Sequence, residues 1–387
     1  MDLTEFHKKM PLKWLAGLTV AVLFVILMAG LKPKDLFPSN KVNWLQNQAG
    51  LRFEKYGLAY TDSISDLIQE HVSPKTGFSV EIALKSKDFQ EEGFHFIFLL
   101  HGGQDRSQLL IGQWRTSLIV MNGDDYSHSR KTKRISVTSS SGLPGTQFLT
   151  VTSAPAGTRV YLDGQLAGGN RGLQLTMPEG GNTRLLIGNS VYGNHPWRGD
   201  IYGVAIFGKA LSETDVEAHF KVWSKAGSFS FAKETAPFIF YNLDQKKGKT
   251  ALNFSDSAHP LHLPSRLKVL TPSFFFQKWE VRKFHRDLFK DKDAVLNFFG
   301  FIPFGFLLAA TLIRRGGRTY NRCIAISLSA GFFVSLLIET IQAWMPTRSS
   351  DVQDLILNTV GTFVGALCCK YLLTPKAAHK AEKASQD

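Results

Sequence analysis

The sequence has little cysteine: Cys323, Cys368 and Cys369 are the only three in 387 residues. All three lie in apolar stretches near the carboxyl terminus. Disulfide bonds therefore cannot stabilise the middle of the chain, where a folded domain must depend on its own hydrophobic core. The middle region is long enough for this, because a domain of about 150 residues already buries most of the surface of its unfolded chain.

The chain is not apolar overall, so its average composition does not reveal the apolar segments at its ends. The mean hydropathy of -0.06 and the 20% of charged residues are typical of a soluble protein, but the apolar residues are concentrated at the two ends. A helix needs about 20 apolar residues to cross about 30 Å of hydrocarbon. We expect four such helices, at about residues 14–31, 295–313, 323–344 and 355–373.

The first apolar stretch has two readings. Residues 14–31 carry no charge and follow three lysines, a pattern that a membrane anchor and a cleaved signal peptide share. The stretch is longer than most signal-peptide cores, and its end is a poor cleavage site. We therefore expect residues 1–34 to form a cytoplasmic amino terminus and an uncleaved transmembrane helix.

Basic residues beside the apolar stretches predict the orientation, because Lys and Arg accumulate on the cytoplasmic side. The loop 314–322 holds four arginines and no acidic residue, and the tail 374–387 is also basic. Both chain ends should thus be cytoplasmic, with the middle region and the loop 346–354 outside. The basic segment 277–291 opposes this trend, and we expect it to lie along the outer lipid surface.

The net charge of +13 could indicate a nucleic-acid partner or a membrane surface. The basic residues lie largely beside the apolar stretches, within reach of lipid phosphates. Membrane lipid therefore accounts for the charge, and we expect no nucleic-acid partner.

The middle region contains short β-like runs separated by Gly, Asp and Ser. Such runs occupy residues 78–84, 95–100, 108–112, 117–121 and 147–151. Asp163-Gly164 lies between two further runs and supplies the positive φ values that a two-residue hairpin turn requires. Many short strands at near-regular spacing predict a sandwich of two antiparallel sheets.

The order of these elements resembles the laminin-G-like, concanavalin A-like jelly roll over residues 48–225. The resemblance rests on the hairpin at Asp163-Gly164, the strands 185–189 and 197–207, and a closing helix for which Ser212 and Asp215 suit the first turn. It implies an all-β jelly-roll sandwich. Members of this family bind sugars or proteins, which implies an envelope glycan or protein as the ligand here.

Two features of the middle region stay open. Some laminin-G-like proteins bind calcium, but the only candidate is Asp124-Asp125, which we interpret as a solvated surface pair. Residues 226–276 are also β-like, and they could extend the sandwich or link it to the membrane.

Polar residues within the last three apolar stretches are spaced to share helix faces. The three stripes are Asp293, Asn297 and Gly300; Gly331, Ser335, Glu339 and Gln342; and Asp351, Asp354, Asn358, Gly361 and Gly365. Polar groups are costly in hydrocarbon and usually face a protein interior or a water-filled cavity, while glycines permit close helix contact. We therefore expect the stripes to face one another.

The predicted orientation brings the polar ends of the stripes to one level. All three lie near the outer side of the membrane, beneath the loop that bears Arg348. The candidate site therefore consists of Asp293, Asn297, Glu339, Gln342, Arg348, Asp351, Asp354 and Asn358.

The same residues carry a family resemblance. The motifs 293–297, 302–306, 335–342 and 348–358 occur in the order typical of the VanZ-like family, over residues 292–373. The resemblance implies a multi-pass protein of the bacterial cytoplasmic membrane, acting in the cell envelope or in the response to glycopeptide antibiotics. It implies no particular reaction.

Three functions are compatible with these features. A receptor or scaffold would bind an envelope glycan or protein through the jelly roll. A membrane enzyme would act on a lipid-linked envelope precursor at the outer leaflet, with Glu339 or Asp354 as acid or base and Arg348 on a phosphate. A purely structural network would pair Arg348 with the carboxylates.

Catalytic motifs do not decide between these functions. The sequence contains no Ser-His-Asp order, Gly-rich phosphate loop or His/Cys metal spacing. We therefore expect neither a cofactor nor a metal, and the sequence leaves it undecided whether the protein is an enzyme.

Overall fold

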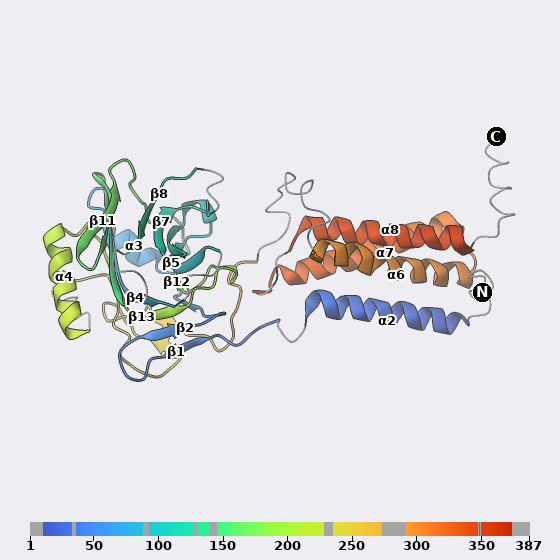
Figure 1. Cartoon of the computed structure of the whole chain (residues 1–387), viewed down its shortest axis with the longest axis horizontal. Coiled ribbons are helices and arrows are strands. Elements are labelled where there is room, and N and C mark those ends of the chain that lie inside the picture. Colours follow the sequence, from blue (N-terminus) through green and yellow to red (C-terminus); the bar gives the residue numbers. More distant parts are fainter. Residues whose placement is uncertain are drawn as a thin grey trace. The chain divides into compact units, whose positions relative to one another are not determined.

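A computed structural model of the chain describes residues 11–32, 36–87, 93–126, 131–138, 145–227, 235–272, 292–346, 348 and 350–373. The chain divides into two compact units (Figure 1). The helical unit comprises Met1–Leu36 and Thr271–Asp387, and the β unit comprises Phe37–Leu270. The predicted basic segment 277–291 and the tail 374–387 lie outside the described residues.

Two sheets form the β unit, and every strand pair in them is antiparallel. The first sheet has the order β1-β2-β13-β4-β9-β10-β11, with β14 also paired to β13. Its strands are β1 (Val42–Trp44), β2 (Leu51–Phe53), β4 (Phe78–Ser86), β9 (Gln147–Ala154), β10 (Gly157–Leu162), β11 (Gln165–Asn170), β13 (Gly199–Phe207) and β14 (Ile239–Tyr241).

The second sheet has the order β15-β16-β3-β12-β5-β6-β7-β8. Its strands are β3 (Ala59–Tyr60), β5 (His95–His101), β6 (Leu109–Trp114), β7 (Ser117–Asn122), β8 (Arg134–Thr138), β12 (Arg184–Ile187), β15 (Thr250–Ala251) and β16 (Leu261–His262). Three short helices accompany the sheets: α3 (Ser65–His71), the 3-10 helix η2 (Asp105–Ser107) and α4 (Glu213–Ala226). The predicted antiparallel sandwich is confirmed.

The central strands β4 and β13 of the first sheet are buried on both faces. In β4, Val80 and Ile82 belong to the main core cluster between the sheets, whereas Ala83 belongs to a second cluster with residues of α4. Successive side chains of a strand point to opposite faces, so α4 covers the outer face of this sheet. This explains why β4 is buried along almost its whole length instead of alternating between core and solvent.

Two local predictions in the β unit are confirmed. Asp163 and Gly164 have φ values of 52° and 76° and join β10 to β11 as a two-residue hairpin. Ser212 caps α4: its hydroxyl accepts the N–H of Asp215, and the Asp215 side chain accepts the N–H of Ser212 in return. Such a reciprocal pair satisfies two N–H groups that the helix itself cannot bond.

Asp125 corrects a prediction. Its carboxylate is buried, accepts the N–H of Thr132 at 2.8 Å and pairs with Arg134 at 2.8 Å. It is therefore an internal anchor of the turn before β8 and not a solvated surface residue. Sequence alone could not show this, because the partner lies on the next strand.

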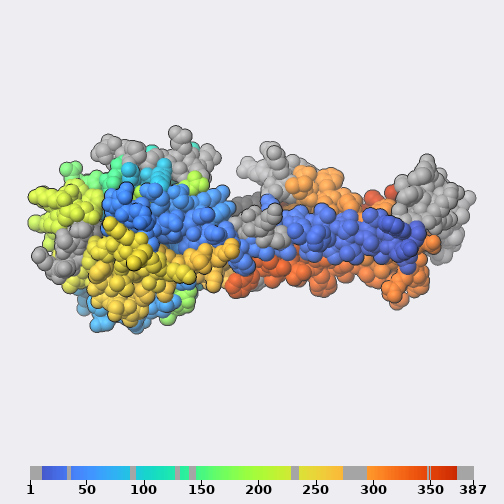
Figure 2. Space-filling view, turned by 90° about the horizontal axis from the view of Figure 1, so that it is seen from below, coloured from blue at the N-terminus to red at the C-terminus, as the bar shows by residue number. Residues whose placement is uncertain are grey.

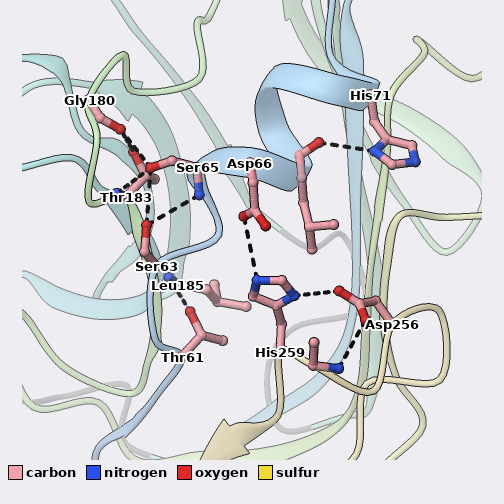
Figure 3. A network of polar contacts seen from close by, with 12 residues as sticks. Thr61, Ser63, Ser65, Asp66, His71, Gly180, Thr183, Leu185, Asp256 and His259 are labelled. Atoms are coloured by element: carbon pink, nitrogen blue, oxygen red, sulfur yellow. Dashed lines mark hydrogen bonds and ion pairs between the residues drawn. The ribbon is translucent and has the colours of Figure 1, made fainter.

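Residues 235–272 join both sheets of the β unit. β14 pairs with β13, and β16 pairs with β3. Figure 3 shows the side chain of His259 between Asp66 of α3 and Asp256, with 3.4 Å from its Nε2 to Asp66 Oδ1. The pKa of Asp256 is lowered because its carboxylate accepts the N–H of Ala258 and bonds to His259.

The two ends of the β unit lie side by side. The N–H of Asn40 donates to Ser265 at 3.2 Å, and the N–H of Leu267 donates to Pro38 at 2.9 Å. The chain therefore enters and leaves the β unit at one place, as expected of a domain inserted into another.

The described residues of the helical unit form four helices: α2 (Leu12–Leu31), α6 (Lys292–Arg315), α7 (Tyr320–Gln342) and α8 (Val352–Leu373). Each is long and apolar enough to cross a membrane, which confirms the four predicted spans. Large apolar side chains on their outer surfaces, such as Val20, Phe24, Leu296 and Phe333, are exposed by 61% or more. Only lipid makes such a surface favourable, so the protein is a membrane protein.

Glycines bring α6 and α8 into backbone contact. A Cβ atom added at Gly305 would lie 2.0 Å from the carbonyl oxygen of Thr362, and one at Gly365 would lie 2.0 Å from that of Ile302. Gly331 of α7 is similarly close to the Thr362 side chain. The expected close contact of the stripes is therefore found, except at Gly300, where an added Cβ meets nothing within 4 Å.

Helix α2 lies along the surface of the other three helices, as the blue segment of the helical unit in Figure 2 shows. Two polar contacts hold it there. The hydroxyls of Thr19 and Thr311 are 3.1 Å apart, and Gln342 Nε2 donates to the carbonyl of Gly30 at 2.9 Å. These contacts hold α2 near its middle and at its carboxyl-terminal end.

Candidate functional site

A cavity of about 860 Å³ lies between the helices of the helical unit. Its polar lining comes from Lys32, Asn297, Glu339, Gln342, Arg348, Asp354 and Asn358. Its apolar lining includes Ala21, Val22, Val25, Ile26, Ala29, Phe301 and Ile338. The structure thus brings six of the eight predicted site residues together around one space.

The convergence follows from the direction of the helices. Gln342 ends α7, whereas Asn297 and Asp354 lie near the starts of α6 and α8. Helices α2 and α7 finish at the end of the unit where α6 and α8 begin, so sequence-distant polar residues reach the same level. Of the other two predicted residues, Asp351 does not line the cavity, and the side chain of Asp293 lies outside the described part of the chain.

Glu339 holds the connection between α7 and α8. Its side chain is almost fully buried, and Oε2 accepts the backbone N–H of Asp351 at 2.8 Å. Asp351 itself is exposed, and its Oδ1 accepts the N–H of Gln353 at 2.8 Å in the first turn of α8. The two carboxylates therefore fix the loop that carries Arg348. Asp351 caps the first turn of α8, and Glu339 binds the backbone of the loop from α7.

Gln342 lines the cavity and uses one end of its amide to hold α2. Its Nε2 donates to Gly30, while Oε1 has no hydrogen-bond partner among the described residues. The carbonyl of Gly30 can only accept, so the amide orientation is set by this bond. The atom left over is therefore an acceptor in a side chain that is 7% exposed.

Asn358 shows the same pattern on the opposite helix. Its Nδ2 donates to Ser335 Oγ at 2.9 Å, and its Oδ1 has no partner in the part of the chain that the structure describes. The residue is 2% exposed. Other buried polar atoms among the described residues, such as Gln147 Oε1 and Asn253 Nδ2, also lack a partner, so what distinguishes these two atoms is that their side chains line the cavity.

Two cationic side chains border the polar end of the cavity. Lys32 follows α2 in a left-handed conformation with φ of 40°, and Arg348 lies in the loop before α8. The ion pairs found between described residues do not include Arg348. The structural reading pairs Arg348 with Asp351, Asp354 or Glu339; of these, Glu339 and Asp351 accept backbone N–H groups of the loop and of the first turn of α8.

The apolar wall has the length of one lipid leaflet. On α2 the lining residues run from Ala21 to Gly30, which corresponds to about 14 Å along a helix axis. Half of a hydrocarbon core of about 30 Å is about 15 Å. The cavity is thus lined by polar residues from its outer end to Asn358, about 9 Å into α8, and by apolar residues along α2.

Sequence analysis missed the contribution of α2. This helix was treated only as an anchor, yet it forms the apolar wall and supplies Lys32. A signal was present in the small residues Ala21, Ala29 and Gly30, which leave room beside the helix.

Family comparisons agree with both resemblances. Residues 236–373 match the model of the VanZ/LLP1 family, and residues 63–217 match that of the concanavalin A-like lectin/glucanases superfamily. The first match begins before β14, so it includes strands of the β unit as well as α6, α7 and α8. No curated protein matches this chain.

Several solved structures resemble the β unit. A Bacteroides ovatus protein described as a candidate carbohydrate-binding protein has a TM-score of 0.37 and 14% identity, covering 55% of this chain and 57% of that one. The NanB sialidase of Streptococcus pneumoniae has a TM-score of 0.33 and 14% identity, covering 44% of this chain and 27% of the sialidase.

The sialidase carbohydrate-binding module of Ruminococcus gnavus, solved with sialyllactose, has a TM-score of 0.32 and 8% identity, and the match covers 46% of this chain and 95% of the module. The chain therefore spans little more than half of the Bacteroides protein and about a quarter of NanB.

Proposed function

We propose that this chain, a VanZ-like membrane region joined to a concanavalin A-like domain, is a cell-envelope protein that binds an amphiphile in the cavity of its helical unit. The arginine-rich loop 314–322 favours a cytoplasmic location for the opposite end of the helices. The cavity then opens in the outer leaflet of the bacterial cytoplasmic membrane, and both chain ends are cytoplasmic.

The observation that carries this proposal is the division of the cavity lining. Polar and cationic side chains occupy one end, and apolar side chains line about 14 Å of α2 below it. A soluble ligand would leave the apolar wall without a partner, and a hydrocarbon would leave the polar end without one. An amphiphile satisfies both.

The geometry supports binding more directly than acid–base chemistry. The carboxylate of Glu339 is engaged by the N–H of Asp351 and fixes the loop that presents Arg348. We therefore assign Glu339 a positioning role. The bond to the loop occupies Oε2 and fixes the orientation of the carboxylate.

The β unit supports a second part of the proposal, in which an envelope glycan is its ligand outside the membrane. The superfamily that it matches includes lectins, which bind carbohydrates. A glycan-array screen with the full chain in detergent would test this: a specific signal supports a receptor role, whereas an array without a signal above that of the detergent alone would remove it.

The amphiphile proposal is tested with two glycine positions that differ in one respect. Added Cβ atoms at Gly300 and at Gly17 would both meet nothing within 4 Å, but only Gly300 lines the cavity. We expect Gly300→Phe to weaken the binding of palmitoyl-oleoyl phosphatidylethanolamine to the delipidated full chain at least tenfold, measured by native mass spectrometry. Gly17→Phe, on the lipid-facing surface of α2, should bind as the wild type does.

Either of two results would overturn the proposal. The wild-type chain could retain no lipid beyond the non-specific background of the detergent. Alternatively, Gly300→Phe could bind the lipid with unchanged affinity although the protein is folded, as judged by its melting temperature.

A further inference from the structure

We infer that the ligand headgroup carries a phosphate with an N–H or O–H donor next to it, an inference that rests on the proposed amphiphile binding. The polar end of the cavity combines two kinds of group with opposite requirements. Lys32 and Arg348 offer positive charge, whereas Gln342 Oε1 and Asn358 Oδ1 offer lone pairs without partners among the described residues.

The cations determine the anionic part of the headgroup. Arginine presents a planar fork of N–H groups that matches two oxygens of a phosphate, and lysine adds a compact positive charge. Two hydrogen bonds hold the backbone of the loop around Arg348. The N–H of Arg348 donates to the carbonyl of Met345 at 3.4 Å, and the N–H of Asp351 donates to Glu339. Lys32 lies at the end of α2, at the depth where lipid phosphates occur.

The acceptors without a partner, Gln342 Oε1 and Asn358 Oδ1, determine which group stands next to the phosphate in the headgroup. The amide of Gln342 cannot turn round to offer its NH₂ group, because Nε2 is committed to the carbonyl of Gly30. A buried acceptor gains most from a ligand that brings a donor, and a phosphate alone brings none at neutral pH. An ammonium or a hydroxyl attached close to the phosphate meets this requirement.

Three common phospholipids differ in whether their headgroup has a hydrogen-bond donor next to the phosphate. Phosphatidylethanolamine has a phosphate and an ammonium with N–H donors, and phosphatidylglycerol has a phosphate and hydroxyl donors. Phosphatidylcholine has the phosphate and a positive charge, but its quaternary nitrogen has no N–H to donate. The first two share the chemistry that the cavity requires, and the third lacks only the donor.

The test compares these lipids, with identical palmitoyl-oleoyl chains, on the delipidated full-length protein by native mass spectrometry. We expect phosphatidylethanolamine and phosphatidylglycerol each to bind about tenfold more tightly than phosphatidylcholine, as two hydrogen bonds to buried acceptors allow. Palmitoyl-oleoyl glycerol, which has a hydroxyl but no phosphate, should bind more weakly than all three. A signal for only one of the two donor-bearing phospholipids would identify the source as an amine or a hydroxyl, and would support the inference.

Variants assign the selectivity to residues. Gln342→Met keeps the size of the side chain and removes the acceptor, so the preference over phosphatidylcholine should fall severalfold. Thr311→Val is the control: it removes the polar contact of α6 with Thr19 without changing a residue that lines the cavity, and should keep the preference. Arg348→Gln should weaken all three phospholipids about tenfold and leave their ratio unchanged.

The wild-type lipid series alone can overturn the inference, even if a variant fails to fold. Equal affinity for phosphatidylcholine would remove the donor requirement while leaving amphiphile binding intact. Binding of palmitoyl-oleoyl glycerol as tight as that of phosphatidylethanolamine would remove the phosphate requirement. Failure of every lipid to bind would remove the proposed function itself.

Discussion

The buried carboxylates of the β unit and of the helical unit have different kinds of partner. In the β unit, buried Glu81 meets His219 at 3.1 Å and Thr150 at 3.2 Å, and buried Asp125 meets Arg134. In the helical unit, buried Glu339 accepts the backbone N–H of Asp351. A carboxylate bonded to side chains of other elements holds those elements together, whereas one bonded to a backbone N–H fixes a loop.

The pKa of Glu81 illustrates the first case. Burial raises the pKa of this carboxyl above its ordinary value, and the hydrogen bond from His219 acts in the opposite direction. The pair has no access to solvent, because both side chains lie between the first sheet and α4. Its role is therefore to hold α4 in register on the sheet.

The largest expected effect is in the helical unit, where backbones touch. Gly305→Ala places a Cβ atom 2.0 Å from the carbonyl oxygen of Thr362, so α6 and α8 must move apart. We expect a loss of about 3 kcal/mol or more in stability, since overpacking at a backbone contact cannot be relieved by a rotamer change. Thermal unfolding in detergent measures it, and hydrogen exchange shows whether the loss is confined to the helices.

Gly17→Ala is the matched control for this change. It also adds one methyl group to a glycine in a transmembrane helix, but nothing lies within 4 Å of the added atom. Equal melting temperatures for the two variants would contradict the described packing of α6 on α8.

The next largest loss of stability is expected in the β unit, when the buried pair of Glu81 and His219 is broken. Glu81→Ala leaves His219 and Thr150 without their buried partner, which should cost about 3 kcal/mol. Hydrogen exchange of α4 and β4 in the full chain measures the loss of protection. Glu217→Ala, which removes an exposed ion pair with Lys221 on the same helix, should cost less than about 0.5 kcal/mol. If the two variants behaved alike, the Glu81 pair would have no special role.

The smallest effect concerns the start of α4. Ser212→Ala removes a cap and should cost about 1 kcal/mol. The pKa of Asp215 is lowered because its carboxylate accepts hydrogen bonds from the hydroxyl and N–H of Ser212. Its contribution is therefore present above the unfolded pKa of about 3.9 and is lost as the pH falls through the lower folded value.

Exchange rates of the first turn of α4, measured between pH 5 and pH 2.5 and corrected for intrinsic exchange, test this dependence. The wild type should lose protection in this range, whereas Asp215→Asn should show a smaller change. A loss of protection that is the same in both would assign the pH dependence to other groups.

Sequence predicted most reliably what depends on local pattern. Apolar length identified α2, α6, α7 and α8, and the dipeptide Asp163-Gly164 identified a hairpin because its φ values suit few other residues. The spacing of polar residues also placed Asn297, Gln342 and Asn358 at one end of the helices, where the cavity lies. The assignment of these residues to a ligand stays a prediction.

Sequence failed where partners come from distant parts of the chain. Asp125 looked solvated because Arg134 lies on another strand, and Gly300 looked like a contact because its neighbours on the facing helix were unknown. Likewise, nothing in residues 12–31 shows that α2 closes a cavity opposite α7. Helix pairing in a membrane has no periodic signature that extends across a large insertion.

The insertion has a consequence for the synthesis of the protein. Helix α2 ends at Leu31 and α6 begins at Lys292, so roughly 260 residues separate two helices that pack together. At about 5 to 20 residues per second, α2 waits in the membrane for roughly 13 to 52 s before α6 begins to be made. During that time the β unit can fold by itself, because the described segments at its two ends bond to each other and not to the helices. The cavity is therefore the last part of the molecule to exist, completed only when α8 arrives.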